Sequence, residues 1–214
     1  MITLLPYIFG LFLNMGYIIE PNTRFLVPSN YRGNANNLYN FIISTYHAFS
    51  VVKCSSLFLL NGSDLMIQYA LYHSMSYFIS DTVILLFEIM FIRARKINLI
   101  FILHHLVSLY FVVLVNMDMV FPGKSFYFGA LTYFTEFPVI FLNLSKFLYK
   151  TNRKDTQLYI INNYLCKVCY FIFRIINLPY IAWITLPYSS LTDRIFLGIL
   201  TLMNYIWFYI IVQK

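Results

Sequence analysis

Two adjacent histidines, His104 and His105, lie inside an apolar stretch and are the best candidates for chemistry in this sequence. A histidine in this setting could take a proton from an amine or a hydroxyl group near neutral pH. Asp81 or Glu136 could orient the imidazole and stabilise its cation, and Arg174 could counter the charge of the acidic groups. Because neighbouring residues point about 100° apart on a helix, we expect at most one of the two histidines to face a shared site directly.

Other polar residues recur at helical spacing, so that each set shares one face of an apolar stretch. Four stretches carry such a polar seam: Asn40, Ser44, His47 and Cys54; Ser74, Tyr77, Asp81 and Glu88; Thr132, Glu136, Asn143 and Lys146; and Asn163, Lys167, Tyr170, Arg174 and Asn177. The simplest arrangement points the seams at one another. We therefore expect His47, Tyr77, Asn143 and Arg174 to line a ligand-binding or structural polar cavity. Hydrogen bonding between helices is the competing role for each of them.

Metal chemistry is the less favoured alternative for the histidines. The sequence has no H-x₃-H or H-E-x-x-H spacing, which would place two ligands on one helix face. We expect no bound metal and no cofactor.

The composition shows where these residues must lie. Of 214 residues, 60% are hydrophobic and only 11% are charged, whereas a soluble domain carries about 25% charged residues. This excludes a soluble enzyme, a disordered chain and a small disulfide scaffold. The net charge of +7 would suit a nucleic-acid partner, but the cations form short clusters between long apolar runs. The sequence therefore predicts a polytopic membrane protein that does not bind nucleic acid.

Seven apolar stretches are long enough to cross the ~30 Å hydrocarbon layer. They are Met1–Ile19, Leu38–Leu60, Leu65–Ile92, Leu99–Met117, Phe126–Phe147, Asn163–Leu186 and Ile195–Val212. Lipid offers no partner for backbone N–H and C=O groups, so we expect all seven to be helices in an all-α fold. We divide the chain into a first transmembrane helix (1–19), a loop (20–35) and one membrane domain (36–214).

The cations indicate the orientation of the chain. Nine lie in the odd-numbered connections and the C-terminal tail: Arg24, Arg32, Arg93, Arg95, Lys96, Lys150, Arg153, Lys154 and Lys214. Only Lys124 and Arg194 lie in the other connections. By the positive-inside rule the N-terminus is lumenal or outside and the C-terminus is cytosolic. With an even number of spans, the basic connections and the C-terminal tail would no longer all lie on one side of the membrane.

Five short motifs resemble those of the TLC-domain family, in the same order and with similar spacing. They are Tyr46-His47-Ala48, the segment 77–81 that ends in Asp81, His104-His105-Leu106-Val107, the segment 135–143 from Thr135 to Asn143, and Phe173-Arg174-Ile175 followed by Pro179. The family includes translocation-associated membrane proteins, ceramide synthases and small relatives of undefined function, which this chain resembles most. The resemblance implies six helices around a central cavity, with the first span outside it, in the endoplasmic reticulum or a related membrane.

The resemblance also implies a class of function. Ceramide synthases transfer an acyl group from acyl-CoA to a sphingoid base with paired histidines and two downstream aspartates. His104 and His105 match the histidines, whereas the stretch 131–136 holds only one acidic residue, Glu136. We therefore expect a protein that binds membrane lipids and affects membrane lipid composition or metabolism. In a catalytic version, His104, His105, Asp81 and Glu136 would be the catalytic residues.

Three alternatives stay open. The first is an acyl-CoA-dependent lipid N- or O-acyltransferase, with acyl-CoA as substrate. The second is a non-enzymatic membrane scaffold or cargo protein, and the third is a proton-coupled carrier, which the lack of a paired repeat disfavours. Abundant Phe, Tyr, Ile and Asn suggest an AT-rich genome, as in some protists and large viruses. For a viral source the membrane would be that of the host.

Overall fold

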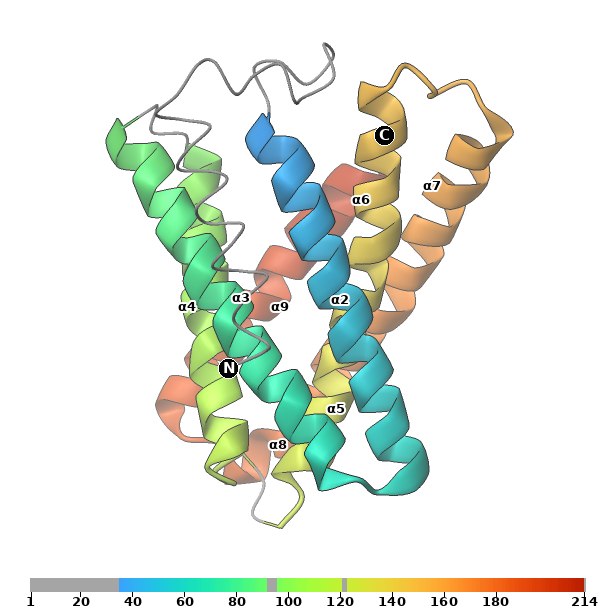
Figure 1. Ribbon diagram of the computed structural model, residues 1–214. Helices are drawn as coiled ribbons and strands as arrows, with labels where there is room; N and C mark the ends of the chain where they lie inside the picture. Colours follow the sequence, from blue (N-terminus) through green and yellow to red (C-terminus); the bar gives the residue numbers. More distant parts are fainter. Residues whose placement is uncertain (1–34, 92–95, 121–122, 214) are drawn as a thin grey trace.

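The computed structural model describes residues 35–91, 96–120 and 123–213 (Figure 1). The predicted first transmembrane helix over 1–19 and all of the predicted loop except residue 35 lie outside the described residues. The described chain is helical apart from short connections and contains no strand. The prediction of an all-α fold is confirmed.

The helices follow the predicted apolar stretches and extend beyond most of their ends. They are α2 (Ala35–Asn61), α3 (Asp64–Phe91), α4 (Lys96–Asn116), α5 (Ser125–Tyr133), α6 (Phe137–Lys150), α7 (Gln157–Tyr170), α8 (Asn177–Thr185) and α9 (Leu191–Val212). Short turns of other helix types, η3 (Phe134–Glu136), η4 (Phe171–Ile176) and η5 (Leu186–Tyr188), follow α5, α7 and α8.

The helices run alternately up and down around a common interior (Figure 1). Contacts join α2 to α3, α3 to α4, α4 to α9, α9 to α7, α7 to α6 and α6 back to α2, which closes a ring. Helix α5 contacts α2, α3, α4 and α8. The α2–α3, α4–α5 and α8–α9 connections lie at one end of the bundle, which we call the α2–α3 end. The α6–α7 connection and the end of α9 lie at the opposite end.

Two of the long helices change their winding near a proline. Pro138 has no N–H for the carbonyl of residue 134, and the chain takes the 3₁₀ turn η3 before α6 begins. Pro179 likewise has no N–H for the carbonyl of residue 175, and the preceding η4 is a π-helical turn. These changes of winding put Glu136 and Arg174 on irregular backbone midway along their helices. Residue 136 lies ~17 Å from the start of α5 and ~21 Å from the end of α6.

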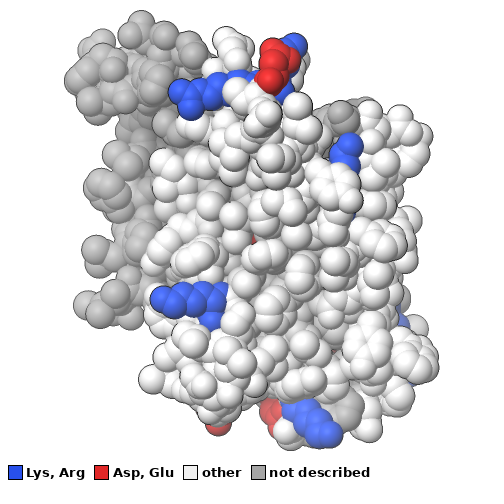
Figure 2. Space-filling model, turned by 90° about the vertical axis from the view of Figure 1, so that its right-hand side faces the viewer, with Lys and Arg blue, Asp and Glu red and all other residues white. Residues whose placement is uncertain are grey.

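The outer surface of the bundle suits a membrane. Figure 2 shows most of the Lys, Arg, Asp and Glu on this face near the two ends, and between them a surface that is uncharged apart from a few cationic side chains. By length and apolar composition, five stretches of the described chain could cross a bilayer: 41–61, 99–116, 125–150, 157–188 and 191–212. Helix α3 has 28 residues, which is also long enough. The protein is a multi-pass membrane protein, and the count of seven spans stays a prediction.

Helix α5 packs tightly against α4 at Gly129. A Cβ atom built on Gly129 would lie 2.7 Å from Cγ1 of Val115, whereas one on Gly198 of α9 would meet no atom within 4 Å. Valine has little freedom to turn away, because branching at Cβ restricts its χ1 angle. Glycine at residue 129 therefore allows α5 to pack against α4.

We predict that Gly129→Ala destabilises the protein by about 1–3 kcal/mol, the usual cost of overpacking a filled core. Gly198→Ala is the matched control and should be neutral or stabilising, since alanine favours helix over glycine. Thermal unfolding in detergent micelles measures both, and Gly129→Ala combined with Val115→Ala should recover part of the loss. Equal melting temperatures for the two single variants would contradict this packing.

Candidate functional site

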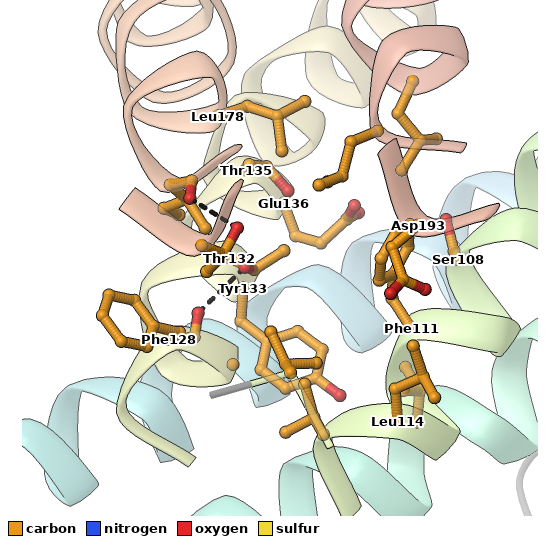
Figure 3. A pocket seen from close by; sticks show the side chains of 18 of the residues that line it. Ser108, Phe111, Leu114, Phe128, Thr132, Tyr133, Thr135, Glu136, Leu178 and Asp193 are labelled. Carbon is orange, nitrogen blue, oxygen red and sulfur yellow. Dashed lines mark hydrogen bonds between the residues drawn. The ribbon is translucent and has the colours of Figure 1, made fainter. Parts of the chain in front are cut away.

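A cavity of about 100 Å³ lies inside the bundle, between α3, α4, α5, α8 and α9. One water needs only ~10–15 Å³ by the same measure, so the space suits a larger occupant. Most of the wall is apolar. The polar groups on it are His104, Ser108, Thr132, Tyr133, Thr135, Glu136, Arg174, Thr185, Ser189, Asp193 and Asn204. Figure 3 shows the carboxylate of Glu136 projecting into this space.

The two adjacent histidines have different surroundings. His104 lines the cavity, and its ring meets the ring of Trp207 edge-on at a centroid distance of 5.3 Å. His105 is not part of the cavity wall and is 5% exposed. Its Nδ1 atom lies 3.4 Å from Oδ2 of Asp81 on α3. The helix therefore presents one histidine to the cavity and holds the other against a carboxylate.

A stack of rings supports the His105–Asp81 pair. Tyr77, one turn before Asp81 on α3, meets His105 edge-on at 5.8 Å. On its other side Tyr77 stacks on His47 of α2 at 4.1 Å, with 13° between the ring planes. Neither His47 nor Tyr77 is part of the cavity wall. Tyr77 contacts His105, and both rings contact Phe78, which does line the cavity.

Glu136 pairs with Arg174 across the junction of η3 and η4. Nη2 of Arg174 lies 3.4 Å from Oε1 of Glu136, and the two side chains are 6% and 14% exposed. Nε of Arg174 donates to the carbonyl of Thr135 at 2.6 Å, and Nη1 donates to Oδ1 of Asn204 at 3.1 Å. The guanidinium also lies 5.2 Å from the centre of the Tyr170 ring. All three nitrogens of the guanidinium therefore have partners.

The irregular turns make this pairing possible. Where the α-helical pattern is interrupted, backbone carbonyls can accept from side chains of another helix. Thr135 accepts from Arg174, and the carbonyl of Leu131 accepts from Nδ2 of Asn177 at 2.9 Å. Side chains of the helix interrupted at Pro179 thus donate hydrogen bonds to backbone carbonyls of the helix interrupted at Pro138.

Asn143 is not among the residues that line this cavity. Its Nδ2 donates to the hydroxyls of Ser44 and Thr45, both at 3.1 Å, and so joins α6 to α2. Asn162 likewise joins α7 to α6, because its Nδ2 donates to the carbonyl of Phe141 and to the hydroxyl of Ser145. For these residues the structure favours hydrogen bonding between helices.

Asn204 is a site residue that sequence reasoning missed. Besides Arg174, its Oδ1 accepts from the hydroxyl of Tyr170 at 3.1 Å, and its Nδ2 donates to the carbonyl of Leu200 at 2.8 Å. A lone asparagine in the otherwise apolar stretch 195–212 was the available signal. It is the one asparagine in that stretch, so it was not part of a set of polar residues at helical spacing.

No group of three or more His, Cys, Asp or Glu side chains in the described part of the chain could hold a metal ion. The polar groups on the cavity wall are acids, bases and hydrogen-bond donors.

The helical ring, its uncharged outer band and its interior cavity define a multi-pass α-helical membrane protein. The sequence matches the TLC domain over residues 36–213. This match covers most of the chain, so the protein belongs to the TLC-domain family, and the resemblance carried by the five motifs is confirmed. No curated protein matches the sequence.

We predict that Arg174→Met costs about 3–5 kcal/mol of stability, because it leaves Glu136 buried without its cation. Adding Glu136→Gln should recover part of this loss, since no unpaired charge then remains. Thermal unfolding of the two single variants and the double variant, purified in detergent, gives the coupling between the residues.

Lys167→Met is the control on the same apolar stretch, because Lys167 has only a long bond of 3.5 Å to the carbonyl of Val212. The ion pair would have no structural role if Arg174→Met unfolded at the same temperature as Lys167→Met.

Proposed function

We propose that the protein binds a membrane lipid in the cavity and thereby affects membrane lipid composition or metabolism. The observation that carries the proposal is an apolar cavity with a few polar groups on its wall, the usual design of a small-molecule site. The apolar wall suits a hydrocarbon chain. Glu136 and His104 offer a hydrogen-bond acceptor and a titratable ring to a polar group of the same molecule.

We place the protein in the endoplasmic reticulum or a related membrane, or in the corresponding host membrane for a viral source. The N-terminus would be lumenal and the C-terminus cytosolic. The predicted excess of Lys and Arg on the C-terminal side supports this orientation. The α6–α7 connection, which carries Arg153 and Lys154, lies at the same end as the end of α9.

A catalytic version of this function is acyl transfer from acyl-CoA to a lipid amine or hydroxyl. His104 lines the cavity and would act as base or as transient acyl acceptor. The acceptor's proton would pass to the imidazole and then to the leaving CoA thiolate, while the carbonyl carbon exchanges its bond to sulfur for one to nitrogen or oxygen. His105 and Asp81 would support His104, and Arg174 would balance the charge of Glu136.

A second candidate is a non-enzymatic scaffold or cargo protein. The bonds of Asn143 to Ser44 and Thr45, and of Asn162 to Ser145, favour it, because they show polar side chains used only to join helices. In this case substitutions at the histidines would lower abundance or stability and would leave lipids unchanged.

We predict that the protein purified in mild detergent retains a lipid, and that Leu200→Trp lowers the amount of that lipid roughly tenfold, equal to about 1.4 kcal/mol. Leu200 lines the cavity, and a larger ring there would occupy the space. Extraction and mass spectrometry of the purified samples measure the bound lipid per protein.

Leu165→Trp is the matched control, because Leu165 is 40% exposed on the outer face of α7. Wild-type protein without lipid above the detergent background, or equal lipid in Leu200→Trp and Leu165→Trp, would contradict lipid binding in the cavity.

For the catalytic version we predict acyl-CoA turnover by the purified protein in lipid nanodiscs, reduced at least about a hundredfold in His104→Ala, as for loss of a general base. Asp81→Asn and His105→Ala should each lower the rate, and their effects should not add, because the two residues act as a pair. Release of the CoA thiol is the measurement.

Asn162→Ala is the control, since it removes a buried hydrogen bond outside the cavity. The catalytic version is wrong if wild type shows no turnover with any acyl-CoA, or if His104→Ala keeps the wild-type rate.

A further inference from the structure

A row of titratable side chains runs along one face of α3. Tyr69, His73, Tyr77 and Asp81 follow one another at intervals of four residues, which places them above one another on the helix. The row begins ~8 Å from the start of α3 at Asp64 and ends ~26 Å from it. It therefore leads from the α2–α3 end of the bundle to the Asp81–His105 pair.

Rings of α2 and α4 make this row continuous as far as the cavity. The His73 ring is 5.7 Å from the Tyr69 ring and 5.7 Å from the His47 ring, which stacks on Tyr77 at 4.1 Å. Tyr77 meets His105 at 5.8 Å, and His105 is 5.6 Å from His104 on the cavity wall. The sequence has four histidines, and all of them belong to this row.

His47 is the member of the row that packing does not explain. It is 1% exposed, and neither of its ring nitrogens has a hydrogen-bond partner among the described residues. A buried polar group without a partner costs about 1–3 kcal/mol. A phenyl ring would stack on Tyr77 without that cost. Buried polar atoms of this kind are often bonded to internal water.

Imidazole can do what a phenyl ring cannot: it accepts a proton at one nitrogen and releases one from the other. A tyrosine hydroxyl likewise accepts and donates. Water bonded to these polar atoms would link them, and the row would then have the parts of a proton-conducting chain. At its outer end Tyr69 is 36% exposed, and at its inner end lies the Asp81–His105 pair.

We propose that Tyr69, His73, His47, Tyr77 and His105, with bound water, carry protons between the α2–α3 end of the bundle and the cavity. This rests on the catalytic version of the proposed function, in which a lipid N–H or O–H in the cavity gives up its proton. Along this route the proton that His104 or His105 takes from the lipid leaves at Tyr69 instead of passing to the CoA thiolate, and the released thiolate takes a proton from water. Every group returns to its starting state and no electrons move.

Other titratable groups border the row on each packed element. Helix α2 contributes Tyr46, Cys54 and the exposed Lys53, helix α5 contributes Tyr133, and η3 contributes Glu136. The stacked rings also stabilise the bundle, by about 0.5–1.5 kcal/mol for each aromatic pair. Because substitutions in the row also remove this packing, a loss of stability would not test proton transfer. The experiment must measure proton exchange directly.

The experiment is hydrogen–deuterium exchange of the imidazole N–H groups, followed by nitrogen-15 solid-state NMR of histidine-labelled protein in liposomes. Four signals are assigned by single substitutions. In wild type we expect His73, His47 and His105 to exchange at similar rates. His47→Phe and Tyr77→Phe keep a ring in place, and each should slow exchange at His105 by at least about tenfold, the loss of one hydrogen-bonded step. Exchange at His73 should stay as in wild type.

Tyr170→Phe is the control, because it removes one buried hydroxyl outside the row. Exchange at His105 that is unchanged in both ring variants would mean that its proton comes from the cavity side, and would overturn the proposal. So would the same slowing in Tyr170→Phe. Lipid extracted from the same wild-type sample separates the two proposals: absence of lipid contradicts the proposed function, whatever the exchange rates show.

Discussion

The buried guanidinium of Arg174 is the constraint on which the interior of this bundle depends. An arginine at membrane depth costs several kcal/mol unless protein groups replace its water. Here three groups from two other elements do so: the carbonyl of Thr135 and the carboxylate of Glu136 on η3, and the amide of Asn204 on α9. Satisfying one cation therefore fixes how η3, η4 and α9 meet, and these elements form one side of the cavity.

Proline supplies the backbone that this arrangement needs. In a regular α-helix each interior carbonyl already accepts one backbone hydrogen bond, so a side-chain donor from a neighbour has to share it. Pro138 and Pro179 interrupt that pattern midway along their helices, and the carbonyls of Leu131 and Thr135 before Pro138 accept from Asn177 and Arg174. The same residues that would weaken an isolated helix thus join two helices where lipid provides no partner.

The sequence was enough to predict the membrane class, the family and the helical stretches, because apolar length and short motifs are local properties. It was not enough to predict which seam faces which helix. Asn143 follows Glu136 by seven residues, which on a regular helix means the same face. In the structure Glu136 pairs with Arg174 of η4, whereas Asn143 on α6 donates to Ser44 of α2, so a shared helix face did not give them a shared partner. Asn204 was missed for a different reason: its partners come from α7 and η4, which periodicity within α9 cannot reveal.

The two acid–base pairs beside the cavity differ in what they can do. Arg174 keeps its proton at any physiological pH, so it and Glu136 cancel as a fixed pair. Asp81 faces a histidine, whose charge can change. Among these four groups, a neutral His105 leaves a net charge of −1 next to an apolar wall, and one added proton brings the net charge to zero. The Arg174–Glu136 pair therefore helps to set the shape of the cavity, whereas the Asp81–His105 pair is the one whose charge can change.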